Sequence, residues 1–275
     1  MARIPETQGF GLFVVSCDAM NRVVTRMLPA PLLLGLFFSS PTAAAPPAKT
    51  AAGLRFAAND KLIIIGDSIT DAGRKPSGEG LFDAVGKGWV ALVDGLLGSA
   101  YPALQIRVIN KGTSGHTTRD LKARWDADVL APSPQWVVVM IGTNDVWRQF
   151  DVPRMKEDAV LIDEYEKNLD ELVSKTIPRV KGMILMTPFY IEPNKGDAMR
   201  ATMDRYGAVV KKLAVKYKTM FVDTQAAFDA LMPHYYPATI AWDRVHPNHI
   251  GTMALARAFL GVVGFSWTGA PSLKH

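Results

Sequence analysis

The sequence predicts a three-layer α/β fold, in which helices cover both faces of a central, five-stranded parallel sheet. Short apolar runs rich in β-branched residues alternate along the chain with longer segments of helical spacing. These runs are continuously apolar, which is typical of parallel strands that are buried on both faces. Because crossovers between parallel strands are right-handed, the alternation favours a doubly wound, flavodoxin-like strand order.

Each expected strand is a short run with few charged residues. The first reads Lys-Leu-Ile-Ile-Ile-Gly, and the third reads Trp-Val-Val-Val-Met-Ile. The strands are expected at residues 61–66, 105–110, 136–141, 182–187 and 219–223.

The segments between the strands have apolar residues three or four positions apart, which predicts amphipathic helices. These are expected at residues 88–98, 117–129, 161–177, 197–217 and 247–263. Thr117 or Thr118 should cap the second helix, and Pro178 should end the third. The inward faces of these two helices are expected to carry Leu121, Trp125 and Val129, and Leu161, Tyr165, Leu169 and Leu172.

The first 45 residues have the features of a secretory signal peptide. Arg22 and Arg26 precede an apolar run at 28–38, which is too short to span a bilayer as a stable helix, and small residues follow. Cleavage is expected near Ala44 or Ala45. We therefore expect an exported protein, periplasmic or extracellular, without stable membrane insertion in its mature form. Residues 46–58 are then a linker and residues 59–268 the folded domain.

Other interpretations of this region stay open. Met20 and Met27 are alternative starts, because the signal peptide is unusually long when counted from Met1. The residues before Cys17 weakly resemble a lipid-attachment site. A disordered tail with chance apolarity would have a similar composition.

Charge and cysteine content argue against several classes of protein. The formal net charge is only +5 and the basic residues are scattered, so no nucleic-acid partner is expected. Cys17 is the single cysteine, which leaves no intramolecular disulfide and no cysteine-based metal site. His246 and His249 have a spacing that metal ligands can use, but Pro247 separates them and no third ligand is evident, so no metal is expected.

Ser68 is a candidate nucleophile because it stands two residues after the first expected strand. Its hydroxyl would be exposed at the edge of the sheet, where a helix N-terminus favours developing negative charge. The sequence Gly-Asp-Ser-Ile-Thr at 66–70 lacks the Gly-x-Ser-x-Gly nucleophile elbow of α/β-hydrolases. The structural alternative is a serine that only caps a helix.

His246 is the best candidate for the general base that a serine nucleophile needs. Of the five histidines it alone has a carboxylate three residues before it, in Asp243. At this spacing the carboxylate can reach Nδ1, which leaves Nε2 free to accept the proton of Ser68. The structural alternative is a capping aspartate beside a surface histidine.

Gly115 and Asn144 follow the second and third expected strands. The N–H groups of Ser68 and Gly115 and the side-chain amide of Asn144 would together form an oxyanion hole with three donors. Each residue alone is more simply explained as part of a turn. All three, however, lie past strand ends, where sheets of this class bind their ligands. The combination indicates acyl transfer through a covalent ester on serine.

Four sequence blocks resemble those of the SGNH-hydrolase (GDSL esterase) superfamily, and the likeness extends over about residues 58–267. Ile69 stands where the name of the family has leucine. The blocks are Gly66-Asp67-Ser68, Gly115 with the five residues before it, Gly142-Thr143-Asn144-Asp145 and Asp243-Arg244-Val245-His246.

Four further stretches are similar to those of the bacterial SGNH acetylxylan esterases, which remove acetyl groups from xylo-oligosaccharides. These stretches are residues 142–149, 186–193, 221–228 and 241–247. The resemblance implies a carbohydrate acetylesterase that has an acetylated carbohydrate as its partner, needs no cofactor, and tends to form homo-oligomers. Candidate substrate-binding residues are Asp67, Trp147, Tyr190 and Trp242.

Alternative functions stay open within and outside this class. The substrate of such an esterase could be a lipid, a thioester or another acetylated glycan. A non-catalytic glycan-binding module would be expected to lack part of the Ser, Asp and His set, but all three are present. A nucleotide-binding protein is disfavoured, because Gly-x-Gly-x-x-Gly does not follow the first strand and no Walker-type lysine is present.

Overall fold

The computed structural model describes residues 53–76, 83–151 and 157–267. The predicted signal peptide lies outside these residues, and so does the predicted linker apart from residues 53–58. Within the described part of the chain, no helix is both long and apolar enough to cross a membrane.

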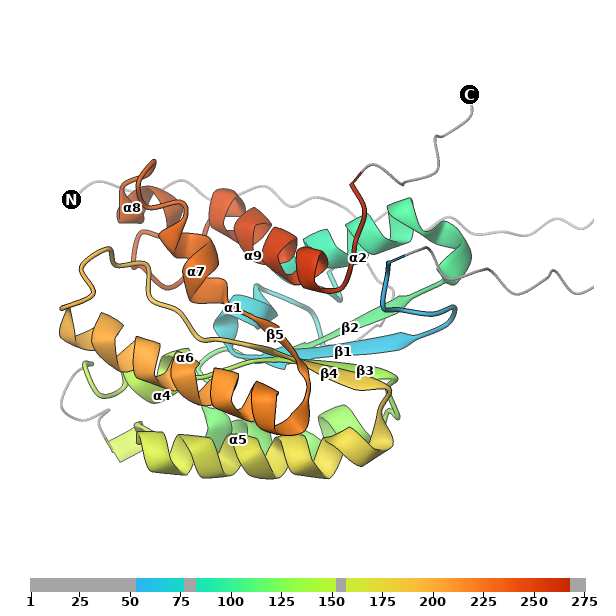
Figure 1. The fold of residues 1–275 in the computed structure, drawn as a ribbon, viewed down its shortest axis with the longest axis horizontal. Coiled ribbons are helices and arrows are strands. Elements are labelled where there is room, and N and C mark those ends of the chain that lie inside the picture. The colour runs from blue at the N-terminus through green and yellow to red at the C-terminus, as the bar shows by residue number, and fades with distance from the viewer. Residues whose placement is uncertain (1–52, 77–82, 152–156, 268–275) are drawn as a thin grey trace, which may run out of the picture. The chain divides into compact units, whose positions relative to one another are not determined.

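The described residues form a five-stranded sheet in the order β2-β1-β3-β4-β5, and every neighbouring pair is parallel (Figure 1). This order confirms the predicted flavodoxin-like arrangement. Only β1 has the predicted bounds. Strands β3, β4 and β5 are one residue shorter than predicted at one or both ends, and β2 lies two residues further along the chain, because it ends in polar residues that the apolar pattern does not mark. The strands are β1 (Lys61–Gly66), β2 (Arg107–Gly112), β3 (Trp136–Met140), β4 (Gly182–Met186) and β5 (Met220–Val222).

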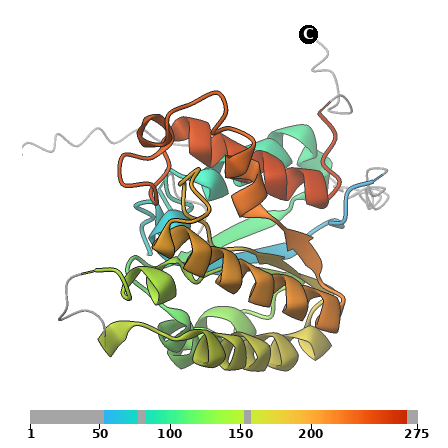
Figure 2. The same ribbon diagram turned by 60° about the vertical axis from the view of Figure 1, so that its left-hand side comes forward.

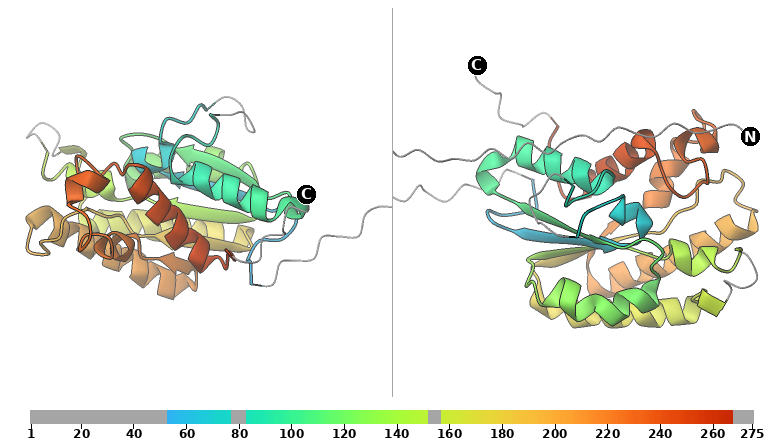
Figure 3. Two further views of the ribbon diagram at one scale, coloured as in Figure 1. Left: turned by 90° about the horizontal axis from the view of Figure 1, so that it is seen from above. Right: turned by 180° about the vertical axis from the view of Figure 1, so that it is seen from behind.

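Helices cover both faces of the sheet, which confirms the three layers. One face carries α1 (Ser68–Asp71), α2 (Trp89–Ala100), α7 (Thr224–Asp229), α8 (Pro237–Ile240) and α9 (His249–Val262). The other carries α3 (Thr118–Trp125), α4 (Thr143–Trp147), α5 (Ile162–Thr176) and α6 (Ala198–Tyr217). The view from behind in Figure 3 shows α2 and α3 on opposite faces. Short helical turns complete the chain at Pro102–Leu104, Asp126–Leu130 and Ile177–Arg179.

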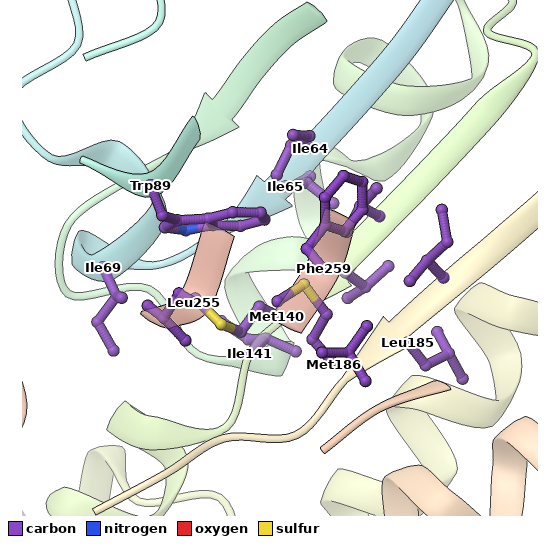
Figure 4. Packing of buried hydrophobic residues seen from close by; sticks show 14 of the residues in the cluster. Ile64, Ile65, Ile69, Trp89, Met140, Ile141, Leu185, Met186, Leu255 and Phe259 are labelled. Carbon is purple, nitrogen blue, oxygen red and sulfur yellow. The ribbon is translucent and has the colours of Figure 1, made fainter. Parts of the chain in front are cut away.

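The core lies between the sheet and these helices. Ile63, Ile64 and Ile65 of β1 are almost fully buried, as expected for a central strand. On the face that Figure 4 shows, Trp89 of α2 and Phe259 of α9 pack edge to face, with ring centroids 5.8 Å apart. Burial of large apolar side chains is the dominant favourable term in folding, so this core stabilises the framework that carries the site.

The ends of the helices follow from local hydrogen bonds. Thr117 caps α3 in a capping box with Asp120, which confirms one of the two predicted caps. The prediction for Leu161 is wrong: its side chain is 63% exposed, whereas the three other predicted inward residues of α5 are buried. Leu161 is the N-cap of α5 and has extended backbone dihedrals, so the helical period does not apply to it.

The carboxyl ends of the strands and the turns that follow them lie at one edge of the sheet, which comes forward in Figure 2. Helix α1 packs directly on the end of β2 there. A Cβ atom added to Gly112 would lie only 2.2 Å from the backbone nitrogen of Asp71, so a glycine is needed at this contact. The close approach places Ser68, the first residue of α1, beside the turn after β2.

Candidate active site

The structure brings the predicted nucleophile, base and carboxylate into one hydrogen-bonded chain. The Oγ atom of Ser68 lies 2.7 Å from Nε2 of His246. The Nδ1 atom of the same ring lies 2.5 Å from Oδ2 of Asp243. Ser68 comes from the turn after β1, and the other two residues come from the loop before α9. Ser68 and the other two residues are at least 175 positions apart in the sequence, yet they meet in the geometry in which a histidine can take a proton from a serine.

Asp243 is held in place by its own loop. Its Oδ1 atom accepts hydrogen bonds from the N–H groups of Val245 at 3.0 Å and His246 at 2.8 Å. Burial alone would raise the pKa of Asp243, but the hydrogen bonds from the ring and the backbone of His246 and from Val245 outweigh it and hold the pKa below the usual 3.8. The carboxylate is therefore ionised near neutral pH and can stabilise an imidazolium.

Arg244, between these residues, has a left-handed backbone with a φ of 64°. Such a conformation costs a non-glycine residue about 1–2 kcal/mol. The loop keeps it because the carbonyl of Arg244 accepts a hydrogen bond from the N–H of Ile191 at 2.9 Å, and its guanidinium pairs with Glu192.

Gly115 lies in a turn that is fastened to the end of β1 and to α1. The N–H of Thr113 donates to the carbonyl of Gly66 at 3.0 Å, and Ser114 donates to Asp71 from both its N–H, at 3.1 Å, and its hydroxyl, at 2.8 Å. Gly115 itself has a φ of 81°, in the region that favours glycine. These contacts hold the turn next to the segment that carries Ser68.

Asn144 is tied to the same turn from the other side. It is buried in the first turn of α4, and its side-chain amide donates to the carbonyl of His116 at 3.0 Å. An amide group has two N–H donors, so this bond orients the side chain and leaves one donor for a ligand. The structure therefore joins two of the predicted oxyanion-hole residues, Gly115 and Asn144, through His116.

Two residues that the sequence analysis missed support this turn. Asp71 holds Ser114, as described above. Arg124 of α3 donates to Nδ1 of His116 at 3.1 Å and to the carbonyl of Gly66 at 3.2 Å. Burial lowers the pKa of His116, and the charge of Arg124 lowers it further, so His116 is neutral near pH 7 and acts as an acceptor. In the sequence, Arg124 and Asp128 form an ordinary i, i+4 helix pair, which gives no signal of this role.

The structure contradicts the prediction that Asp67 contacts substrate. Its side chain is 1% exposed and accepts a hydrogen bond from the N–H of Ile69 at 3.0 Å, as the N-cap of α1. Asp145, also buried, receives hydrogen bonds from the N–H and hydroxyl of Thr118. Asp67 therefore lies beneath the nucleophile and shapes the turn that presents it.

Burial gives both of these carboxyl groups high pKa values. It raises the pKa of Asp67 to about 7, and the charge of Asp145 adds to the rise, although the hydrogen bond from Ile69 opposes it. It raises the pKa of Asp145 to about 6, although hydrogen bonds from Thr118 oppose it. Ionising either group near neutral pH therefore costs free energy in the folded state.

Of the aromatic residues predicted to bind substrate, Trp147 has its ring beside the ring of His246. Its ring centroid lies 6.0 Å from that of His246. Tyr190 is partly buried in the loop after β4, and its N–H donates to Gln225 at 2.8 Å. Trp242, next to Asp243, is 82% exposed. All three belong to the segments that surround the triad, but the contacts of a substrate with them stay a prediction.

A groove of about 290 Å³ opens beside Ser68 and His246. Among the described residues, Lys87 lines the groove and no carboxylate does. Both ring nitrogens of His246 are engaged with Ser68 and Asp243, so the His-x-x-His spacing to His249 does not leave a free ligand on this ring. The remaining lining residues are Ile69, Ala72, Gly88, Pro247, Asn248, His249 and Thr252.

Comparison with known proteins agrees with this site. The model of the GDSL-like Lipase/Acylhydrolase family matches residues 64–254. An acetylxylan esterase of Geobacillus stearothermophilus is 60% identical over 215 residues, which are 78% of this chain and 98% of the relative.

Solved structures show the same relationship. The crystal structure of a catalytic mutant of that Geobacillus stearothermophilus esterase has a TM-score of 0.76 and 59% identity, and covers 78% of this chain and 98% of its own. An α/β hydrolase enzyme from the metagenome of Lake Arreo, Spain, has a TM-score of 0.76 and 54% identity, and covers 78% of this chain and 99% of its own. The chain is thus a carboxylic-ester hydrolase, and it belongs to the GDSL-like lipase/acylhydrolase family.

Proposed function

We propose that this protein is a serine esterase that removes acetyl groups from acetylated xylan or xylo-oligosaccharides through an acetyl-serine intermediate. The observation that carries the proposal is the chain of hydrogen bonds from Ser68 through His246 to Asp243, beside an open groove. The choice of substrate is supported by the 60% identical acetylxylan esterase, of which this chain matches 98%.

In the first half of the reaction, the Oγ atom of Ser68 attacks the carbonyl carbon of the acetyl ester. Nε2 of His246 accepts the hydroxyl proton, and Asp243 stabilises the imidazolium that forms. The bond between the carbonyl carbon and the sugar oxygen then breaks. His246 returns the proton to that oxygen, so the sugar leaves as an alcohol and the acetyl group stays on Ser68.

The negative charge that develops on the carbonyl oxygen needs hydrogen-bond donors. The N–H of Ser68, the N–H of Gly115 and the side-chain amide of Asn144 supply them in this proposal. The bonds of Asp71 to Ser114 and of Asn144 to His116 fix two of these donors before substrate arrives. Preorganised donors matter because losing one typically lowers kcat by about 10²- to 10³-fold.

In the second half of the reaction, water replaces the sugar. His246 takes a proton from the water molecule, whose oxygen attacks the acetyl carbon. The bond to Ser68 Oγ breaks, and the proton passes to Ser68, so acetic acid leaves and ionises to acetate by releasing its own proton to the solvent, and the enzyme returns to its starting state. Water is the only co-substrate, and His246 performs both proton transfers at Ser68.

The test is acetate release from a panel of esters by the wild-type protein and by Ser68→Ala. We expect acetylated xylan and xylo-oligosaccharides to be better substrates than acetylated pectin, and 4-nitrophenyl acetate to be better than the octanoate. Ser68→Ala should lower kcat by about 10⁴-fold or more without changing Tm. A folded Ser68→Ala protein with substantial activity would refute the nucleophile, and a preference for pectin or octanoate would refute the substrate.

We also propose that the protein is exported with a signal peptide that ends near residue 45. Support comes from the basic residues Arg22 and Arg26 before the apolar run at 28–38 and from the small residues that follow it. N-terminal sequencing of protein from the periplasm or the medium should give a start close to Pro46. Protein found inside the cell, with its N-terminus intact, would contradict export.

Self-association is a further proposal, supported by the behaviour that the family resemblance implies. Light scattering of the purified mature protein should give a mass of at least two chains. A single-chain mass at micromolar concentration would contradict it.

A further inference from the structure

The loop that carries Asp243 and His246 is held by a neighbouring loop rather than by regular secondary structure. Its central residue, Arg244, has a left-handed backbone, which is an unfavourable conformation for a residue with a long side chain. A conformation of this kind persists only when surrounding contacts fix it. The contacts that hold Arg244 therefore bear directly on the distance between His246 and Ser68.

One of those contacts, from the N–H of Arg244 to the carbonyl of Ala241 at 3.0 Å, lies within its own loop, and two more come from the loop after β4. The N–H of Ile191 donates to the carbonyl of Arg244 at 2.9 Å. The next residue, Glu192, pairs through Oε2 with the guanidinium of Arg244, while its Oε1 accepts the N–H of Asn194 at 2.8 Å. Glu192 is 8% exposed, so its carboxylate has lost most of its water and depends on these partners.

The loop that carries Glu192 is in turn fastened to two helices. Arg200 of α6, which is 2% exposed, donates to the carbonyl of Glu192 at 2.6 Å. The same guanidinium pairs with Asp204 at 2.9 Å and with Asp229 of α7 at 2.8 Å. Because α6 and α7 are packed elements, Glu192 presents its carboxylate from a rigid support.

We propose that Glu192 is a positioning residue: through its ion pair with Arg244 it holds the Asp243–His246 loop at hydrogen-bond distance from Ser68. The proposal rests on the serine-esterase function proposed above. Glu192 does not line the groove beside Ser68; with Arg244 it lines a separate groove of about 480 Å³. The proposal therefore predicts an effect on kcat, through the alignment of the imidazole, whereas a role in binding substrate would change KM.

The test compares two variants of Glu192 and one of Arg244 with 4-nitrophenyl acetate as substrate. Glu192→Ala should lower kcat by about 10- to 100-fold, since small misplacements of reacting groups have effects of that size, and leave KM within about twofold. Glu192→Gln keeps the side-chain shape and one acceptor, so it should recover part of the loss. Inactivation of Ser68 by a fluorophosphonate should slow by a similar factor, because it needs the same proton transfer to His246.

Arg244→Gly separates positioning from stability. Glycine adopts the left-handed backbone freely, which offsets part of the stability lost when the Glu192 carboxylate loses its partner, so the change in Tm should be small while kcat falls as in Glu192→Ala. The matched control is Glu166→Gln, which removes one charge of an exposed ion pair with Lys212 outside this network and should leave kcat within about twofold.

Two results would overturn the proposal. One is a folded Glu192→Ala protein whose kcat stays within twofold of wild type; if that variant does not fold, unchanged kcat in both Glu192→Gln and Arg244→Gly has the same consequence. The other is a Glu192 or Arg244 variant whose lower activity comes only from a higher KM, with kcat unchanged. A wild-type protein that does not hydrolyse the ester, or one whose activity survives Ser68→Ala, would instead show that the proposed function is wrong.

Discussion

At the scale of single residues, the site combines one carboxyl group that is ionised near neutral pH with two whose neutral forms are favoured. Asp243 is ionised because its loop supplies three hydrogen-bond donors. Asp67 and Asp145 lie in a buried environment that favours their neutral forms. A carboxyl group with a raised pKa therefore lies next to the nucleophile, and perturbed pKa values of this kind cluster at functional sites.

The raised pKa of Asp67 predicts how the stability of the protein depends on pH. The folded-state pKa of Asp67, about 7, lies above its unfolded value of about 3.8, so folding takes up a proton between these values. The contribution of Asp67 is therefore most favourable below about pH 4 and is lost as the pH rises toward about 7. Asp67→Asn keeps an oxygen that can accept the N–H of Ile69 but removes the charge.

We expect Asp67→Asn to be more stable than wild type by about 1–4 kcal/mol at pH 8, with the difference shrinking toward pH 4. The free energy of unfolding in urea, measured for both proteins across this range, checks the prediction. A difference that does not change with pH would show that Asp67 does not titrate between these values in the folded state.

At the scale of elements, the site depends on short helices that pack directly on strand ends. Helix α1 has only four residues, too few to be stable alone, and it is held by contacts with β2. Asp71 at its end also fastens Ser114, next to Gly115. The spacing between α1 and β2 therefore sets the positions of the nucleophile and of one oxyanion donor together.

Gly112→Ala should displace both the nucleophile Ser68 and the oxyanion donor Gly115. The added Cβ would lie 2.2 Å from the nitrogen of Asp71, which requires backbone movement, and such overpacking typically costs about 1–3 kcal/mol. We expect lower stability and lower kcat in the same variant. The matched control is Gly95→Ala in α2, where no atom outside the helix's own backbone lies within 4 Å of the added Cβ and alanine should stabilise the helix by about 0.5–1 kcal/mol.

Urea unfolding gives the stability of each variant and steady-state kinetics gives its kcat. We expect both quantities to fall only in Gly112→Ala. Equal stability and equal kcat for Gly112→Ala and wild type would mean that α1 can move away from β2 without consequence for the site.

At the scale of the whole molecule, the sequence predicted what depends on strong local patterns. The five strands and the longer helices have marked apolar periodicity, and parallel pairing then limits the order of the strands. Ser68, Asp243 and His246 were identified because their chemistry requires that combination, and their hydrogen bonds agree with it.

The features that the sequence did not predict are short elements or depend on contacts between segments far apart in the chain. Helices α4, α7 and α8 are too short to show a period. The partners of Arg124, and the pairing of Glu192 with Arg244, appear only once the fold brings their loops together. The burial of Asp67 is also a tertiary property, and a charged residue before a serine reads as exposed in the sequence alone.

The most direct test of the central claim is to trap the acetylated enzyme and locate the acetyl group. Wild-type protein is mixed with excess 4-nitrophenyl acetate, quenched in acid within the first turnover, digested and examined by mass spectrometry. We expect one acetyl group on the peptide that contains Ser68, removed again when the reaction is left to complete, and none at that peptide in Ser68→Ala. Full turnover by wild type with acetyl found on another residue, or with activity kept in Ser68→Ala, would contradict a covalent mechanism at Ser68.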